Sequence, residues 1–233
     1  MEDIVTSTPT VRVALFDISG TLVSVNAWLG ITQAPQISTA RRRWLIGSHL
    51  PMWLAWKMRV YSEIRFRDRW IRGLAHLLKG FHRDQVQEIC AWGVNTYLAP
   101  YYREDILEEL KNYKQSGSTI VLVSNIFQEF VDAMCQRIGA DGGIGTLLAY
   151  DDANIATGKI ASMPSAGPQK VENVIAWLQQ HNIKANLSTE AAAYADSISD
   201  VPLLSAVQYP NATYPDAQLR AYAQQHQWRI VEK

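Results

Sequence analysis

Two polar clusters in the chain each follow an apolar run of the kind that forms a buried strand. The segment DISGTL at 17–22 follows the apolar run 11–16, and the segment DSISD at 196–200 follows the run 191–194. Because ligands bind at the carboxyl ends of the strands in open α/β sheets, both clusters are expected to line one pocket. Carboxylate oxygens are the ligands that Mg²⁺ and similar cations prefer in proteins. The spacing therefore predicts an acidic pocket that binds a divalent cation.

The elements that must position these clusters alternate between strands and helices outside residues 26–98. Strands are predicted at 11–16, 119–123 and 191–194, with an edge strand at 228–231 and an antiparallel pair at 146–150 and 159–160. Helices are predicted at 104–113, 127–138, 171–180, 201–206 and 217–225. This alternation is typical of an α/β fold with a doubly wound, Rossmann-like parallel sheet.

The segment between the first two predicted strands has a different pattern. Residues 26–98 show apolar residues at helical spacings and no strand pattern, and Pro51 is a predicted helix start. The predicted organisation is a core domain of residues 1–25 and 99–233, into which residues 26–98 insert an all-helical domain.

The inserted segment is basic and rich in tryptophan, although the formal net charge of the whole chain is zero. Residues 41–83 hold 9 Arg and 2 Lys against 1 Glu and 1 Asp, together with 4 of the chain's 8 Trp. A cationic face of this kind is solvated, recruits an anionic substrate, or contacts an anionic membrane surface. No specific nucleic-acid-binding motif accompanies the charge. The apolar run 44–61 is too short and too charged for a transmembrane helix.

Composition limits the remaining alternatives. The chain is 48% hydrophobic and 19% charged, as expected for an ordinary globular protein. Cys90 and Cys135 are its two cysteines, and their wide separation argues against a disulfide framework or a thiolate metal site. Residues 1–10 lack the features of a signal peptide, which predicts a cytoplasmic protein, with peripheral membrane contact as an alternative. The oligomeric state stays open.

Taken together, these segments resemble the four motifs of the haloacid dehalogenase-like hydrolase superfamily. The run DISGT at 17–21 resembles motif I, which reads D-x-D-G-T in the phosphatases, and TIVLVS at 119–124 is similar to motif II. Lys170 matches the motif III lysine, and 196–200 matches the D-x-x-x-D of motif IV. The tail 209–228 further resembles the phosphoserine-phosphatase-like branch, which has a helical cap between motifs I and II.

The resemblance implies roles in phosphoryl transfer for residues of these motifs. Asp17 is expected to be a nucleophile that forms an aspartyl-phosphate, with Ser124 and Lys170 binding the phosphoryl oxygens. The substrate phosphate is expected to contact Gly20, Thr21, Ser124, Asn125 and Lys170. A Mg²⁺ ion is expected to be held by Asp17, the main-chain carbonyl of Ser19, Asp196 and Asp200.

Ser19 departs from the pattern of the family, whose phosphatases have a second Asp here that protonates the leaving group. A serine hydroxyl cannot do this at neutral pH. General acid–base catalysis contributes about 10²–10⁴-fold in rate, or roughly 3–5 kcal/mol of barrier. We therefore expect either slow turnover or a substrate with a good leaving group, such as an acyl phosphate.

The predicted function is that of a Mg²⁺-dependent phosphatase that acts on a small phosphorylated substrate. The alternative is a catalytically impaired phosphate-binding or membrane-associated interaction protein of the same fold. Dehalogenase chemistry uses the same nucleophile on carbon, but Lys170 and the acidic pair Asp196 and Asp200 fit a metal–phosphate site better.

Overall fold

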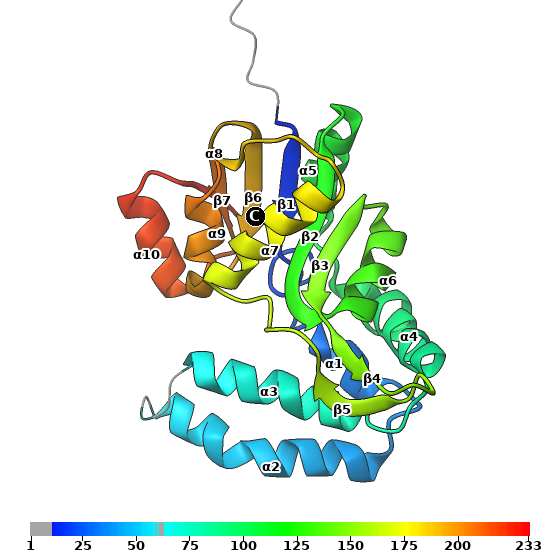
Figure 1. Ribbon diagram of the computed structural model, residues 1–233. Helices are drawn as coiled ribbons and strands as arrows, with labels where there is room; N and C mark the ends of the chain where they lie inside the picture. Colours follow the sequence, from blue (N-terminus) through cyan, green and yellow to red (C-terminus); the bar gives the residue numbers. More distant parts are fainter. Residues whose placement is uncertain (1–10, 59, 61–62) are drawn as a thin grey trace, which may run out of the picture.

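The computed structural model describes residues 11–58, 60 and 63–233 (Figure 1). Residues 1–10, from which the absence of a signal peptide is predicted, lie outside the described residues, as do Arg59 and Tyr61 of the basic insert. Over the described ranges, none of the helices combines the length and the hydropathy needed to cross a bilayer.

Six strands form the central sheet (Figure 1). They are β1 (Val13–Phe16), β2 (Thr119–Phe127), β3 (Gly142–Thr146), β6 (Ala191–Ala195), β7 (Tyr209–Thr213) and β8 (Arg229–Val231). Their order is β3-β2-β1-β6-β7-β8, and every neighbouring pair is parallel. The doubly wound parallel sheet is thus confirmed, and the carboxyl ends of β1, β2 and β6 lie at one edge.

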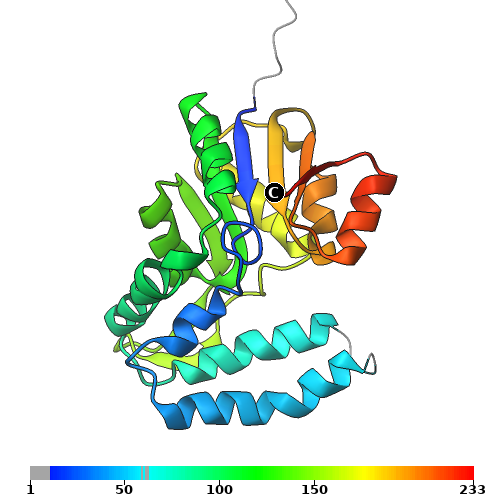
Figure 2. The same cartoon turned by 180° about the vertical axis from the view of Figure 1, so that it is seen from behind.

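Alternation along the strands sends apolar side chains to both faces of the sheet. Phe16 of β1 belongs to one buried cluster and Leu15 to the other. The helices that pack on the first face are α5 (Glu104–Gln115) and α6 (Gln128–Ile138). Those on the second face are α7 (Pro168–Gln180), α9 (Val201–Ser205) and α10 (Ala217–Gln225). Figure 1 shows α7 in front of the sheet, and Figure 2 shows the reverse face with α5 in front.

Between β1 and β2 the described residues form helices and helical turns without a strand, as predicted. These are α1 (Trp28–Gln33), α2 (Thr39–Lys57), α3 (Glu63–Leu77), α4 (Arg83–Trp92), η1 (Gly93–Tyr97) and η2 (Ala99–Tyr101). Figure 1 shows α2 and α3 side by side as a layer beyond the strand ends, and this layer is the cap. In contrast, α4 packs on α6 of the core. The helical insertion is confirmed, whereas its bounds at 26 and 98 stay a prediction.

A hairpin from the second half of the chain joins the cap. Its strands, β4 (Leu148–Tyr150) and β5 (Ala156–Ile160), are antiparallel, which confirms the predicted pair, although Thr146 belongs to β3. The N–H of Gly80, after α3, donates to the carbonyl of Ala156 at 2.9 Å, and the N–H of Ala156 donates to the carbonyl of Phe81 at 2.8 Å. The short helices α8 (Leu187–Glu190) and η3 (Ile198–Asp200) complete the structure.

The prediction that Pro51 starts a helix is wrong, because Pro51 lies inside α2. The helix begins after Ser38, whose hydroxyl accepts a hydrogen bond from the N–H of Arg41 at 3.3 Å and so caps the first turn. A proline usually ends or kinks a helix because it lacks the N–H that bonds the preceding turn. Here α2 continues through Pro51 to Lys57 and packs against α3.

The strands β3 and β7 are additions to the predicted sheet. Because β3 has glycine at positions 142, 143 and 145, it lacks the apolar residues by which a strand is predicted from sequence. A Cβ at Gly143 would lie 2.3 Å from the side chain of Val131 on α6, so glycine allows the helix to pack closely on the strand. The sequence YPNAT of β7 likewise lacks the apolar alternation that marks a strand.

Candidate active site

The two polar clusters of the sequence meet at the switch point of the sheet. Strands β1 and β6 are neighbours, but the chain continues from them toward opposite edges, and ligands bind at such a point in α/β sheets. Asp17 directly follows β1, and Asp196 directly follows β6. The N–H of Asp17 donates to the carbonyl of Tyr194 at 2.9 Å, which joins the two strand ends.

Three carboxylates form a compact cluster at this point. One oxygen atom each of Asp17, Asp196 and Asp200 lies within 4.8 Å of the other two. Burial, reinforced by the neighbouring carboxylates and opposed by Lys170, raises the pKa of Asp17 to about 6 and that of Asp196 to about 8. Such crowding of negative charge favours a bound cation, and hard carboxylate oxygens suit Mg²⁺. The residues present therefore fit the predicted ion.

Lys170, in the first turn of α7, is buried between two of these carboxylates. Its Nζ lies 2.7 Å from Oδ1 of Asp17 and 2.7 Å from Oδ1 of Asp200. Burial by itself lowers the pKa of this ammonium group, but attraction to both carboxylates outweighs burial, so the pKa lies above its usual value. Lys170 therefore stays charged and supplies a fixed positive charge beside Asp17.

The loop after β1 depends on a glycine and a serine. Gly20 has a φ of +83°, and a Cβ there would lie 2.0 Å from Oδ2 of Asp196. Only glycine allows the loop to approach that carboxylate so closely. The hydroxyl of Ser19 accepts a hydrogen bond from the N–H of Ala27 at 3.0 Å. The Ser19 side chain thus ties the loop to the start of the helical insertion.

A cavity lies beside the three carboxylates, and only some of the residues predicted to bind phosphate line this cavity. Ser124 and Asn125 lie in β2 and line it together with Lys170. The hydroxyl of Ser124 is buried and accepts a hydrogen bond from the N–H of Ile126 at 3.4 Å. Thr21 is fully buried outside the cavity lining, and its hydroxyl has no hydrogen-bond partner among the described residues.

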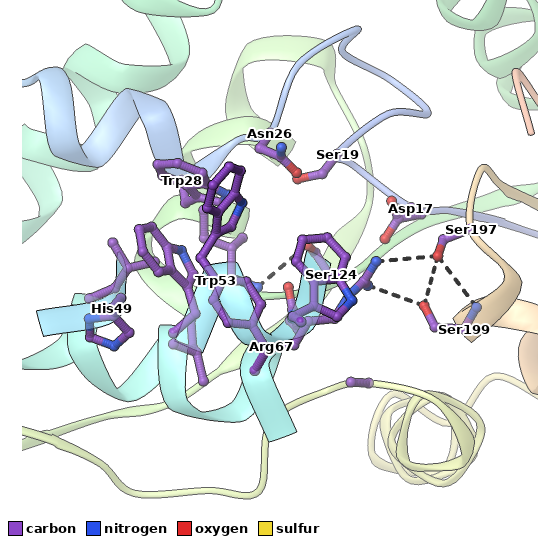
Figure 3. Close-up of a pocket in the computed structure, with 18 of the residues that line it drawn as sticks. Asp17, Ser19, Asn26, Trp28, His49, Trp53, Arg67, Ser124, Ser197 and Ser199 are labelled. Carbon is purple, nitrogen blue, oxygen red and sulfur yellow. Dashed lines mark hydrogen bonds between the residues drawn. The ribbon is translucent and has the colours of Figure 1, made fainter. Parts of the chain in front are cut away.

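A cavity of about 500 Å³ extends from the carboxylates toward the cap (Figure 3). Arg67 of α3 reaches across it, and its guanidinium donates to the hydroxyl of Ser199 at 3.2 Å and to that of Ser197 at 3.3 Å. Its charge also favours the ionised form of Asp17 and so acts to lower that pKa. Sequence reasoning does not single out Arg67, because no motif separates it from the other arginines of the insert. The local excess of positive charge is the one signal that includes it.

Comparison with known proteins identifies chains that are similar to this one in sequence and in fold. The profile of the haloacid dehalogenase-like hydrolase family matches residues 14–205. A histidinol-phosphatase from Neisseria meningitidis serogroup C (strain 8013) is 25% identical over 154 residues, which make up 66% of this chain and 66% of that protein. The matched regions span about half to two thirds of the length of the curated relatives.

Solved structures agree in fold. A protein of unknown function from Bordetella pertussis Tohama I superposes with a TM-score of 0.81 at 22% identity, covering 96% of this chain and 99% of that one. A phospho-aspartyl intermediate analogue of phosphoserine phosphatase gives a TM-score of 0.65 at 18% identity, with coverages of 96% and 94%. This likeness agrees with the predicted fold class. Since the family profile matches most of its length, the chain belongs to the haloacid dehalogenase-like hydrolase family.

Proposed function

We propose that this protein is a Mg²⁺-dependent phosphatase that acts on a small phosphorylated substrate. The observation that carries the proposal is the buried ion pair of Lys170 with Asp17 and Asp200, next to Asp196, at the switch point of the sheet. Phosphoryl transfer depends mainly on positioning and on stabilisation of negative charge. A buried carboxylate beside a fixed ammonium group, with further carboxylates for a cation, meets both needs.

The proposed reaction has two steps. First, a carboxylate oxygen of Asp17 attacks phosphorus, the bond from phosphorus to the substrate oxygen breaks, and that oxygen leaves with its electron pair and takes a proton from water. Second, a water molecule attacks phosphorus and gives a proton to solvent, and the bond from phosphorus to Asp17 breaks. Phosphate is released and the carboxylate is restored. Lys170 and Ser124 bind the phosphoryl oxygens throughout.

The metal would be held by Asp17, Asp196, Asp200 and the main-chain carbonyl of Ser19. When bound, Mg²⁺ offsets the negative charge that the carboxylates and the substrate phosphate bring together. When all three carboxylates are ionised, as they must be to hold the ion, their charge exceeds that of Lys170 and Arg67, so without the cation they would repel a phosphate. We therefore expect substrate binding itself to depend on the cation.

Ser19 restricts which substrates react quickly. Its hydroxyl already accepts the N–H of Ala27, and a serine hydroxyl is too weak an acid to protonate a departing alkoxide. We propose that the preferred substrates carry a leaving group that departs without a proton donor, such as an acyl phosphate or an aryl phosphate.

Steady-state hydrolysis tests this function. Purified protein should release phosphate from p-nitrophenyl phosphate and acetyl phosphate in the presence of Mg²⁺, and release should stop with EDTA. The Asp17→Asn variant, which keeps the shape of the side chain but removes the nucleophile, should show no activity above buffer. Equal rates for the two proteins on both substrates would refute the proposal.

A peripheral contact with an anionic membrane is a second proposal, favoured by the outward side of α2. Trp44 is 46% exposed and Met58 is 73% exposed, and neither lines the cavity. Arg43, next to Trp44 in the sequence, is exposed on the same helix. An interfacial tryptophan beside cationic side chains suits the surface of a membrane that contains anionic lipid.

Cosedimentation with vesicles tests this contact. The protein should sediment with vesicles that contain phosphatidylglycerol more than with vesicles of phosphatidylcholine alone. Replacing Trp44 and Met58 by serine should abolish the difference, whereas Ile175→Ser, at an exposed position of α7, should not. No preference for anionic vesicles at low salt would remove this proposal.

A further inference from the structure

The cavity beside Asp17 continues into an apolar chamber within the cap. Five aromatic side chains line this part, namely Trp28, Trp53, Trp56, Phe66 and Trp70. Figure 3 shows Trp28 and Trp53 on the side away from Asp17. The cavity therefore has a polar end, which holds the catalytic residues, and an aromatic end of different chemistry.

Helical spacing and ring contacts build the walls of this chamber. Trp53 and Trp56 are three residues apart on α2, and Phe66 and Trp70 are four apart on α3, so each pair shares one side of its helix. The rings of Trp56 and Phe66 stack with centroids 5.2 Å apart, and those of Phe66 and Trp70 lie 6.1 Å apart. The two helices thus present a continuous aromatic surface to the cavity.

The charges that line the cavity are gathered at its polar end. Among the described residues, the lining carboxylates are those of Asp17, Asp196 and Asp200, and none lies in the aromatic chamber. Arg67, the cationic lining residue of the cap, is held against Ser197 and Ser199 of the core. Phosphoserine has no apolar group that could cover the aromatic side chains, so it gains little binding free energy from this chamber.

We propose that the substrate is a phosphate monoester of a large apolar group, which packs against the aromatic surface of α2 and α3 while its phosphate lies at Asp17. This inference rests on the proposed phosphatase function and names the substrate class of the same site. The cavity of about 500 Å³ is large enough for such a group and lies within the usual range of ligand pockets, about 300–1,000 Å³. Both an aryl group and a long alkyl chain share the required apolar chemistry.

Ser19 favours the aryl member of this class. A phenol has a pKa of about 10, close to that of tyrosine, so its oxygen departs as an anion more readily than that of an aliphatic alcohol. A site that lacks the usual proton donor therefore loses less rate on an aryl phosphate. The aromatic chamber and the missing carboxylate at position 19 lead to the same expected substrate from unrelated observations.

Binding to the Asp17→Asn variant tests the chamber separately from catalysis. Tryptophan fluorescence would be titrated, in the presence of Mg²⁺, with phenyl phosphate, 1-naphthyl phosphate, decyl phosphate and phosphoserine. Each buried methylene equivalent is worth about fourfold in affinity, so 1-naphthyl phosphate should bind at least about tenfold more tightly than phenyl phosphate. Phosphoserine should bind most weakly, and decyl phosphate decides between aryl and alkyl groups.

Two leucines on α2 provide a matched pair of variants. Leu50 and Leu54 are each 47% exposed, but Leu50 lines the cavity and Leu54 does not. In the Asp17→Asn background, Leu50→Ala should reduce the affinity for 1-naphthyl phosphate about fivefold or more, and Leu54→Ala should leave it unchanged. Equal affinities for phenyl and naphthyl phosphate, or equal effects of the two substitutions, would overturn the inference.

The same ligands separate this inference from the proposed function. If the wild-type protein hydrolyses phenyl phosphate and shows no preference for naphthyl phosphate, the apolar substrate class is refuted and the proposed phosphatase function stands. If the protein binds naphthyl phosphate preferentially but hydrolyses none of the esters, the chamber is a ligand-binding site and the proposed phosphatase function is refuted.

Discussion

Ser19→Asp is the substitution that most directly tests how the active site works. It restores the carboxylate that the family's phosphatases carry at this position, whose acid–base role contributes about 10²–10⁴-fold in rate. The structure shows what the new carboxylate would meet, because the Ser19 hydroxyl accepts the N–H of Ala27 at 3.0 Å. One oxygen of Asp would keep that hydrogen bond, and the other would face the cavity, which Ser19 lines.

The hydrogen bond from Ala27 also limits the expected gain. A hydrogen bond to a carboxylate stabilises its ionised form and lowers its pKa, so less of the protonated acid is present at neutral pH. We therefore expect kcat/KM for an alkyl phosphate to rise by about 10²-fold, at the lower end of the range, and to rise more at pH 6 than at pH 8. Acetyl phosphate, whose leaving group needs no proton, should gain less than about threefold in kcat/KM.

Ser19→Asn is the matched control for this prediction. Asparagine keeps the size of Asp and an oxygen that accepts the N–H of Ala27, but it cannot transfer a proton. Rates would be measured by phosphate release at several pH values for both variants, with folding checked by circular dichroism. If Ser19→Asp and Ser19→Asn hydrolyse the alkyl phosphate equally fast, the missing proton donor is not what limits this enzyme.

Three further predictions concern the loop, the lysine and the cation. Gly20→Ala places a Cβ 2.0 Å from Oδ2 of Asp196 and should reduce Mg²⁺-dependent hydrolysis at least about tenfold, whereas Gly117→Ala has the same φ of +83° in open space and should lose only stability. Equal losses of activity would show that the contact with Asp196 is unimportant. Lys170→Met leaves buried carboxylates unpaired and should lower the free energy of unfolding in urea by about 3–5 kcal/mol, and an unchanged midpoint would contradict the buried ion pair. Because the folded state raises the pKa values of Asp17 and Asp196, ionising them costs stability as pH rises from about 4 toward 8. Mg²⁺ binds the ionised carboxylates, so it should raise Tm more at pH 8 than at pH 5, and equal shifts would count against the cluster as its site.

The catalytic end of the site could be predicted because its signals are local. Asp17 and Asp196 each follow an apolar run, and parallel strands bring such ends to one edge whatever lies between them in the chain. Lys170 lies far from both residues in the sequence, but its match to the third family motif predicts that it belongs to the same site. Thr21 shows the limit of this reasoning, since membership of a motif does not say whether a side chain points into the cavity or into the core.

The chamber in the cap could not be predicted in the same way. Apolar residues lie on more than one side of α2, so the sequence does not say that Trp53 lines the cavity and Trp44 does not. That distinction depends on how α3 packs against α2, which is a tertiary property. Arg67 is likewise one of many arginines until the fold places it against Ser197 and Ser199. Charge and tryptophan content left open whether the insert is merely solvated, recruits an anionic substrate or contacts a membrane.

Ser19 and the aromatic chamber are best understood together. A phosphatase that lost its proton donor would turn over alkyl esters slowly, but the same loss costs little when the leaving group is a stable anion. A chamber lined by aromatic side chains such as Trp53 and Phe66 selects leaving groups of that kind, because a phenol is both flat and apolar. Ser19 also has a structural task, since its hydroxyl holds the N–H of Ala27 where the chain enters the cap. An enzyme with serine at position 19 can therefore be active if its cap selects substrates with a stable leaving group. Such an enzyme should hydrolyse 1-naphthyl phosphate faster than any alkyl phosphate of equal size.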